Sequence, residues 1–195
     1  MLDVYLVRIN QDLAENDFTR LLRYAAPEKK ERILRYHRRE DAQRSLVGDI
    51  LARYAICKRL GVSNAALAIG QNEYGKPLLL KPTGIHFNIS HAGEWVACAV
   101  ADSPVGIDIE PLKPVDYKLA ESFCAKEEYL FLQQQPEETR LKHFYHFWTS
   151  KESYVKADGR GLSLPLASVT AAANCSYFTA ELDNYILSIC VLSPA

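Results

Sequence analysis

The sequence predicts an α+β protein made of two lobes of similar size that meet near residue 105. The chain has 195 residues, enough for one large domain or for two small packed lobes. Runs rich in β-branched residues and stretches with helical spacing of apolar residues follow one another along it. Their order is strand, helix, strands, helices and then strands, and this order favours the α+β class.

The first half is predicted to begin with a strand, LDVYLVRI, at 2–9. A helical stretch, broken once, follows Pro27; its residues Leu46, Ile50 and Tyr54 share a face, and Gly61 ends it. A short strand at 66–71 and a turn, NEYGKP, come next. Three further strands are predicted to form a meander: IHFNIS, EWVACAVA and VGIDIE.

The second half is predicted to open with two helices, at about 116–135 and at 137–158, the second ending at Gly159. The tail contains three β-rich runs, LASVTAAA, YFTAELD and YILSICVL, with a turn at Asp183-Asn184 between the last two. The sequence contains no low-complexity segment and no clear repeat.

Composition excludes several classes of protein. Hydrophobic residues make up 48% of the chain and charged residues 24%, which is typical of a globular protein with a core. The net charge of −1 argues against a nucleic-acid binder. The five cysteines are odd in number and form no CxxC pair, which favours a reducing cytosol over a disulfide framework or zinc site. The start, MLDVYLVRIN, does not resemble a signal peptide, and no run approaches the ~20 apolar residues of a membrane span, so we expect a soluble cytoplasmic protein.

The run VGIDIE places two carboxylates in an otherwise apolar strand. Because side chains alternate along a strand, Asp108 and Glu110 share one face and Ile107 and Ile109 share the other. Two like charges on one face repel each other and resist removal from water. The face could simply be exposed, since antiparallel sheets often have one wet side.

A second pair of charges lies on the last predicted helix. Glu152 and Lys156 are four residues apart, so they share a face and could be a solvated surface pair. Glu152 could instead join Asp108 and Glu110 as a third oxygen ligand. Three carboxylates, with water and a substrate phosphate, make a plausible magnesium site, and a divalent cation would relieve the repulsion within VGIDIE.

Candidate phosphate-binding groups occur in the first half. Seven Lys and Arg residues lie between Lys29 and Arg44, although Glu28, Glu31, Glu40 and Asp41 could make this stretch a solvated helix face. YGKP places Lys76 in a turn before Pro77, and Ser90 and His91 lie where a strand ends. A histidine in such a place often has a structural role. Taken together with three carboxylates, these donors indicate a diphosphate site.

The motifs YGKP, FNISHAGEWVACA, GIDIE and FWTSKESYVKADGRGLSLPL resemble, in order and spacing, those of the Sfp-type 4'-phosphopantetheinyl transferases. PEKKERILRYHRREDAQRSLVGD also resembles the family's basic helical region, so the resemblance covers roughly residues 1–190. It implies two similar α+β lobes related by a pseudo-two-fold, with the active site in the cleft between them. Residues 1–104 would then bind coenzyme A, and residues 105–195 would hold the metal and dock the carrier protein.

The resemblance also implies roles for single residues. The expected Mg²⁺ ligands are Asp108, Glu110 and Glu152, and the expected catalytic residues are Glu152 and Lys156. The groups expected at the coenzyme A site are Lys76, Pro77, Ser90, His91 and Lys156, with Lys29, Arg32, Arg44 and Ser45 near its 3'-phosphate. Glu128 matches an acidic position of the family to which we assign no role.

The implied activity is the transfer of the 4'-phosphopantetheine arm of coenzyme A to a serine of an apo peptidyl or acyl carrier protein. The KES and GRGLSLPL motifs resemble the branch that serves nonribosomal peptide synthetases, and GRGLSLPL with the following strands is the expected docking surface. We expect a monomer that binds neither nucleic acid nor membrane. Two rival hypotheses remain, an inert coenzyme A or nucleotide-binding module and a magnesium-dependent phosphatase or nucleotidyl transferase, although no P-loop is present.

Overall fold

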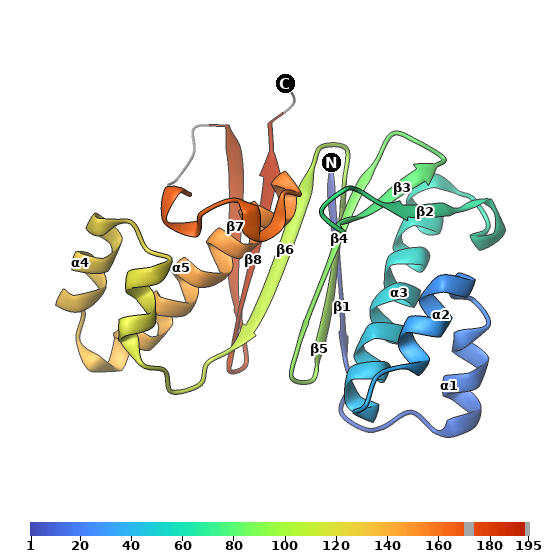
Figure 1. The fold of residues 1–195 in the computed structure, drawn as a ribbon, viewed down its shortest axis with the longest axis horizontal. Helices are drawn as coiled ribbons and strands as arrows, with labels where there is room; N and C mark the ends of the chain where they lie inside the picture. Colours follow the sequence, from blue (N-terminus) through green and yellow to red (C-terminus); the bar gives the residue numbers. More distant parts are fainter. Residues whose placement is uncertain (170–173, 194–195) are drawn as a thin grey trace.

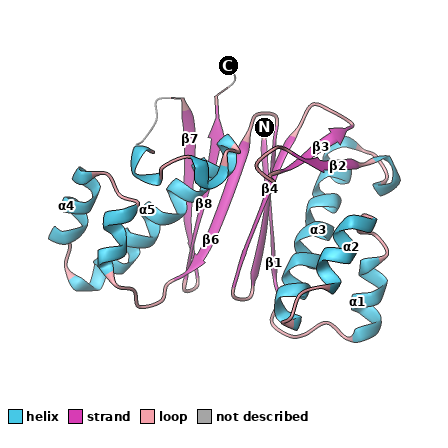
Figure 2. Cartoon of the chain, viewed as in Figure 1, coloured by secondary structure: helices cyan, strands magenta, loops and turns pink. Residues whose placement is uncertain are grey.

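The computed structural model describes residues 1–169 and 174–193. Two three-stranded antiparallel sheets lie side by side in the middle of the molecule, and the helices of each half lie on the outer side of its sheet (Figure 1). The strand orders are β1-β5-β4 and β6-β8-β7. In both halves, therefore, a first strand pairs with the last strand of a following hairpin. Figure 2 shows the mixed helix and strand content, which confirms the predicted α+β class.

The first half consists of one sheet, a long helix and smaller elements around them. The elements are β1 (Leu2–Arg8), α1 (Glu15–Leu22), α2 (Pro27–Leu34), α3 (Arg39–Leu60), η1 (Asn64–Ala66), β2 (Ala68–Gln71), β3 (Pro77–Lys81), β4 (His86–Ala92) and β5 (Trp95–Ala101). Helix α3 packs on β5 and β4, burying Ile56 against Val96 and Val100. It ends at Gly61, whose φ of 66° is the left-handed cap that the sequence predicts.

The second half also has one three-stranded sheet and one long helix, with two α-helices in its described part where the first half has three. Its elements are β6 (Val105–Pro111), η2 (Tyr117–Ser122), α4 (Lys126–Gln134), α5 (Glu137–Asp158), η3 (Gly161–Ser163), η4 (Leu166–Ser168), β7 (Cys175–Leu182) and β8 (Tyr185–Leu192). Helix α5 packs on β6 and β8. Its bounds, its end at Gly159 and the Asp183-Asn184 turn between β7 and β8 agree with the sequence prediction.

An apolar layer joins the two sheets. Its buried members are Ala97, Ala99 and Ala101 from β5, Val105, Ile107 and Ile109 from β6, and Leu187 and Ile189 from β8. The alternate residues of β5 belong to the core under α3. Because this layer takes one face of β6, the other face, which carries Asp108, turns toward α5.

The predicted meander of three strands is wrong at its last member. Strands β4 and β5 form a hairpin, but β6 pairs with β8, with Ile107 opposite Ile189. The reason is that a strand has two edges, and β1 and β4 already occupy both edges of β5. The chain therefore starts a second sheet after the turn at 102–104.

Other differences concern single elements. Helix α1 and strand β3 were not predicted, and the helix expected at 116–135 is divided into η2 and α4. Part of the expected strand at 166–173 is the short helix η4, and its residues 170–173 lie outside the described residues. Tyr54 does not share the buried face of Leu46: it is 54% exposed. Eight residues advance an α-helix ~80° beyond two full turns, which moves Tyr54 toward solvent.

None of the helices in the described chain combines the length and the apolar character that crossing a bilayer would require.

Candidate active site

The close approach of α5 to β6 builds the site. Gly106 lies where the two elements meet, and a Cβ atom there would collide with the α5 backbone at Ser153 and Ala157. No other residue type could occupy this position without moving the helix. The glycine of GIDIE therefore allows α5 to bring Lys156 over Asp108.

Asp108 is the centre of a buried polar cluster. It is 3% exposed, and its Oδ1 accepts a hydrogen bond from Lys156 Nζ at 2.6 Å and another from Ser90 Oγ at 3.0 Å. Its Oδ2 is buried and has no hydrogen-bond partner among the described residues. The exposed-face alternative for Asp108 is therefore wrong. A buried carboxylate oxygen without a partner is costly, so it indicates a place for a ligand that the protein alone does not supply.

Two side chains of β4, the edge strand of the first sheet, form hydrogen bonds to the backbone of β6. Asn88 Oδ1 accepts a hydrogen bond from the backbone N–H of Ile107 at 3.0 Å, and Ser90 Oγ accepts one from Ile109 at 3.3 Å. Lys156 Nζ also lies 3.1 Å from Ser90 Oγ. The two sheets thus meet through side chains rather than through a continuous ladder, and Ser90 joins both halves at the cluster.

Glu110 and Glu152 lie beside the cluster, half-buried. Burial and then the charge of Asp108 raise the pKa of Glu110 to about 7, while Lys156 and a hydrogen bond from Trp148 act in the opposite direction. Burial also raises the pKa of Glu152, against the attraction of Lys156. Loss of water is thus the main cause in both groups, and repulsion from Asp108 adds to it.

The donor set fits a hard divalent cation in part. Within residues 1–169 and 174–193, no group of three or more His, Cys, Asp and Glu side chains is close enough to hold a metal by itself. A cation at this point would nevertheless pair with the unpartnered Oδ2 of Asp108 and stabilise the ionised form of Glu110, whose pKa is raised. Mg²⁺ usually takes one or two carboxylates and completes its shell with water and phosphate, which this incomplete set allows.

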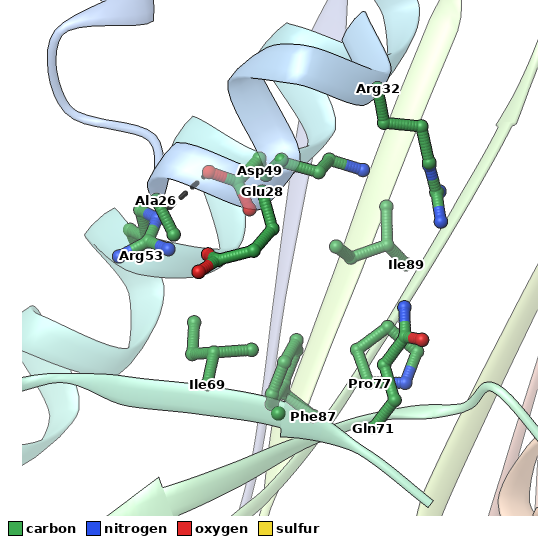
Figure 3. Close-up of a pocket in the computed structure, with 12 residues that line it drawn as sticks. Ala26, Glu28, Arg32, Asp49, Arg53, Ile69, Gln71, Pro77, Phe87 and Ile89 are labelled. Atoms are coloured by element: carbon green, nitrogen blue, oxygen red, sulfur yellow. Dashed lines mark hydrogen bonds and ion pairs between the residues drawn. The ribbon is translucent and has the colours of Figure 1, made fainter. Parts of the chain in front are cut away.

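A cavity of about 540 Å³ lies on the other side of β4, between α2, α3 and the β2–β3 hairpin (Figure 3). The residues predicted for the coenzyme A site that line it are Lys29, Arg32 and Pro77. Burial and then the charge of Arg32 lower the pKa of Lys29. The carboxylates of Glu28 and Asp49 line the same space, and Asp49 pairs with Arg53. Lys29 and Arg32 therefore leave the cavity wall with an excess of positive charge that would favour an anionic ligand.

Most of the cavity wall was not predicted. Phe87, Ile89, Ile69 and Gln71 line it, together with Arg53, whose Nε lies 2.8 Å from Oδ2 of Asp49 (Figure 3). The i,i+4 spacing of Asp49 and Arg53 was a usable signal for their ion pair. Alternation along β4 relates the two sites: Phe87 and Ile89 line the cavity, while Asn88 and Ser90 bond to β6.

Other predicted residues lie outside the cavity. Arg44 pairs with Asp41 at 2.5 Å, as the solvated-face alternative expected, and also donates to the carbonyl of Gly93 at 3.2 Å. Ser45 is buried on α3. Lys76 directs its ammonium at the C-terminal end of α5, 2.8 Å from the carbonyl oxygen of Ala157. The alternative of a solvated surface pair between Glu152 and Lys156 is wrong, because Lys156 forms its ion pair with Asp108.

His91 lies near several of these cations. It keeps an exposed edge, and loss of water around the rest of its ring is the largest cause that lowers its pKa. The charges of Arg44, Lys156 and Lys29 lower it further. Cations from α2, α3 and α5 therefore act on one imidazole at the end of β4.

Glu128 has a structural environment. Its carboxylate accepts a hydrogen bond from the backbone N–H of Ala125 at 2.7 Å, which caps α4, and lies 2.9 Å from Lys151 Nζ. Lys151 also donates to the backbone carbonyls of Leu166 and Val169. The pair joins α4, α5 and the segment after α5.

A carboxylate–lysine cluster close to a cavity that contains Lys29 and Arg32 is an arrangement suited to phosphate chemistry. Two family descriptions match the chain: "4'-phosphopantetheinyl transferase, N-terminal" over residues 12–103 and "4'-phosphopantetheinyl transferase superfamily" over residues 104–188.

Named relatives agree with these matches. The chain is 34% identical to the 4'-phosphopantetheinyl transferase Sfp of Bacillus subtilis (strain 168), over 98% of this chain and 92% of the relative. It is 41% identical to a 4'-phosphopantetheinyl transferase of Bacillus subtilis, over 85% and 74% of the two chains. It is 39% identical to the 4'-phosphopantetheinyl transferase gsp of Aneurinibacillus migulanus, over 86% and 70%. The chain belongs to the Sfp-type 4'-phosphopantetheinyl transferases and is a transferase enzyme, as its motifs predicted.

Proposed function

We propose that the enzyme transfers the 4'-phosphopantetheine arm of coenzyme A to a serine of an apo carrier protein. The serine Oγ forms a bond to the phosphorus that carries the pantetheine arm. The bond from that phosphorus to the leaving oxygen breaks, and adenosine 3',5'-bisphosphate departs. The observation that carries this proposal is the contact of Lys156 on α5 with Asp108 on β6, with Glu110 and Glu152 as charged neighbours. Ser90 joins this contact to β4, the strand that also lines the cationic cavity.

Asp108, Glu110 and Glu152 would hold Mg²⁺. When bound, the ion would neutralise charge on the diphosphate and support the leaving phosphate. The unpartnered Oδ2 of Asp108 and the raised pKa of Glu110 support this assignment.

Glu152 and Lys156 have separate roles in the proposed mechanism. Glu152 accepts the proton of the carrier serine, as a half-buried carboxylate close to Asp108 and Lys156. The Lys156 ammonium lies close to the carboxylates and stabilises negative charge as it develops on the leaving oxygen. Because phosphoryl transfer requires little covalent work from the protein, position and charge supply most of the rate.

Coenzyme A would lie along the cationic cavity and reach the carboxylates at the end of β4. Lys29 and Arg32, which line the cavity, would bind its 3'-phosphate. Arg44 and Ser45, which lie outside the cavity, stay candidates for the same phosphate. Pro77, Ser90 and His91 would border the path from the cavity to the cluster. The Lys76 ammonium, which the sequence predicted at this site, contacts the carbonyl oxygen of Ala157 at the end of α5 instead. We further propose that residues 1–104 and 105–195 are two lobes related by a pseudo-two-fold, with the active site in the cleft between them. The repeated strand order supports this relation.

The proposed partner is a peptidyl carrier domain of a nonribosomal peptide synthetase, as the KES and GRGLSLPL motifs suggest. The segment 159–166, which directly follows α5, would dock it together with β7 and β8. We propose a monomeric enzyme that acts in the cytoplasm and binds neither nucleic acid nor membrane. The odd number and scattered placing of the cysteines along the sequence support a reducing compartment.

One experiment tests the proposal and separates it from its rivals. The protein is mixed with coenzyme A, MgCl₂ and an apo carrier domain, and intact-mass spectrometry of the carrier follows the reaction. Addition of one phosphopantetheine to the carrier, absent when its acceptor serine is alanine or when EDTA is present, is the expected result. Coenzyme A binding without transfer would favour the inert module, and release of inorganic phosphate without carrier modification would favour a phosphatase.

A further inference from the structure

A turn from the first half of the chain contacts the C-terminal end of α5 in the second half. Asn72, after β2, donates from its side-chain nitrogen to the carbonyl oxygen of Gly159 at 2.8 Å. Lys76, just before β3, donates from Nζ to the carbonyl oxygen of Ala157 at 2.8 Å and lies 3.4 Å from that of Val105. The two side chains therefore contact both the end of α5 and the start of β6.

The turn is internally fixed by the same asparagine. The Oδ1 atom of Asn72 accepts hydrogen bonds from the backbone N–H groups of Tyr74 at 3.0 Å and Lys76 at 2.8 Å. Gly75 provides the left-handed backbone, with a φ of 84°, that closes the turn. One end of the Asn72 amide thus shapes the turn, and the other end binds the helix.

The end of α5 has the chemical features that these donors satisfy. The last carbonyl groups of a helix lack partners within it and carry partial negative charge, so an ammonium group there is favourable. Gly159 has a φ of 90°, and a Cβ atom at this position would come within 3.1 Å of the Lys76 side chain and 3.2 Å of Asn72. The glycine that ends α5 therefore also leaves room for the two side chains.

These contacts lie next to the catalytic cluster. Ala157 directly follows Lys156, and Val105 begins the strand that carries Asp108. The Lys76 ammonium therefore bridges the two elements whose separation decides whether Lys156 reaches Asp108.

We propose that Asn72 and Lys76 are positioning residues, which set the place of Lys156 by holding the end of α5 against β6. Lys76 then acts on the reaction through Lys156, not by contact with coenzyme A as the sequence led us to expect. The kinetic part of this proposal rests on the proposed function.

Three variants test it. Lys76→Met removes the ammonium and keeps the length of the side chain. Asn72→Asp keeps an oxygen that can accept the hydrogen bonds of the turn, but replaces the donor to Gly159 with a carboxylate. Lys81→Met is the matched control, because Lys81 is an exposed lysine at the end of the same hairpin.

Steady-state transfer is measured for each variant with coenzyme A and carrier varied separately. Since small displacements of catalytic groups can cost ~100-fold, we expect kcat to fall at least ~10-fold in Lys76→Met and Asn72→Asp, with less than about a twofold change in KM for coenzyme A. In a Lys156→Ala background, Lys76→Met is expected to cause no further loss. A raised KM for coenzyme A at unchanged kcat, or a loss of equal size in the Lys156→Ala background, would overturn the proposal.

Hydrogen exchange separates this inference from the proposed function. Amides of residues 155–159 are expected to exchange at least ~5-fold faster in Lys76→Met and Asn72→Asp than in the wild type or in Lys81→Met, because the end of α5 opens more easily. Unchanged exchange would overturn the positioning role even if transfer activity is found. Failure of the wild type to modify any carrier would instead contradict the proposed function and leave the exchange result as the test of the contact.

Discussion

The ammonium nitrogen of Lys156 lies 2.6 Å from Oδ1 of Asp108, across the junction of α5 and β6. Asp108 is almost completely buried, and about a quarter of the Lys156 side chain remains exposed, 28%. A pair in this environment differs from a surface ion pair, since removal of either partner leaves a charge that water cannot fully solvate. The pair also occupies one oxygen of Asp108 and leaves the other available.

Replacement of Lys156 by alanine is expected to reduce transfer ~100-fold or more, with little change in coenzyme A binding, because its contact strengthens as charge develops on the leaving oxygen. The matched control is Lys142→Ala on the same helix. Lys142 forms an exposed pair with Glu181 at 2.8 Å, so we expect almost no loss of stability and full activity. Full activity in Lys156→Ala would end its catalytic assignment.

Asp108→Asn tests the magnesium assignment. The substitution keeps the size of the side chain but removes the charge that a cation would require, so turnover is expected to fall ~100-fold, in line with the loss of one electrostatic contact in a transition state. Thermal unfolding with and without MgCl₂ gives a second measurement: the ion is expected to raise the Tm of the wild type and not that of the variant. An equal rise in both proteins would show that Mg²⁺ binds elsewhere.

The cationic cavity predicts a preference for coenzyme A over its 3'-dephospho form. A charge-assisted phosphate contact contributes about 1.5–3 kcal/mol, so neutralising Lys29 and Arg32 together is expected to raise KM for coenzyme A more than ~100-fold and to erase the preference. Arg44→Gln is expected to have a smaller effect, because Arg44 already pairs with Asp41. Kinetics with both substrates provide the measurement, and a preference that survives in the double variant would return α2 to the solvated-face interpretation.

Local sequence patterns predicted which residues form the site, but not which of them contact one another. Alternation along β6 correctly put Asp108 and Glu110 on the face opposite the buried Ile107 and Ile109. Helical spacing paired Lys156 with Glu152, its neighbour on the helix, but the structure pairs it with Asp108. That partner lies 48 positions away and is brought close by the packing of α5 on β6.

The contact of the Lys76 side chain likewise could not be predicted from the sequence. Its turn was predicted, but its ammonium meets a carbonyl 81 positions away because the two halves pack together. Spacing along the chain carries no information about such contacts. Gly106, in contrast, was visible in GIDIE, and α5 was predicted, but the close contact between them was not.

The pKa of Lys76 leads to a pH-dependent prediction. Burial lowers it from the ordinary 10.5 to about 8, while Asp158 and Cys190 act in the opposite direction. Between these two values the unfolded chain binds more protons than the folded one, so this group makes the free energy of unfolding rise with pH across that window. Urea unfolding of both proteins provides the measurement. The free energy of unfolding of the wild type minus that of Lys76→Met is expected to rise from pH 8 to 10.5, because only the wild type has this group. The same difference at every pH would contradict the burial of the ammonium.

Gly106→Ala tests whether the approach of α5 to β6 builds the site. The added Cβ would meet the backbone of Ser153 and Ala157, which cannot rotate away as a side chain can. We therefore expect a loss of about 3 kcal/mol in the free energy of unfolding, at the upper end of what overpacking costs, together with loss of transfer as Lys156 moves from Asp108. Gly48→Ala is the control: its Cβ would meet the side-chain methyl groups of Ile89 at 3.1 Å and Val96 at 3.7 Å, and alanine is favoured within a helix. Urea unfolding and carrier modification are measured on both variants. Near-normal stability and activity in Gly106→Ala would mean that the helix position does not depend on this glycine.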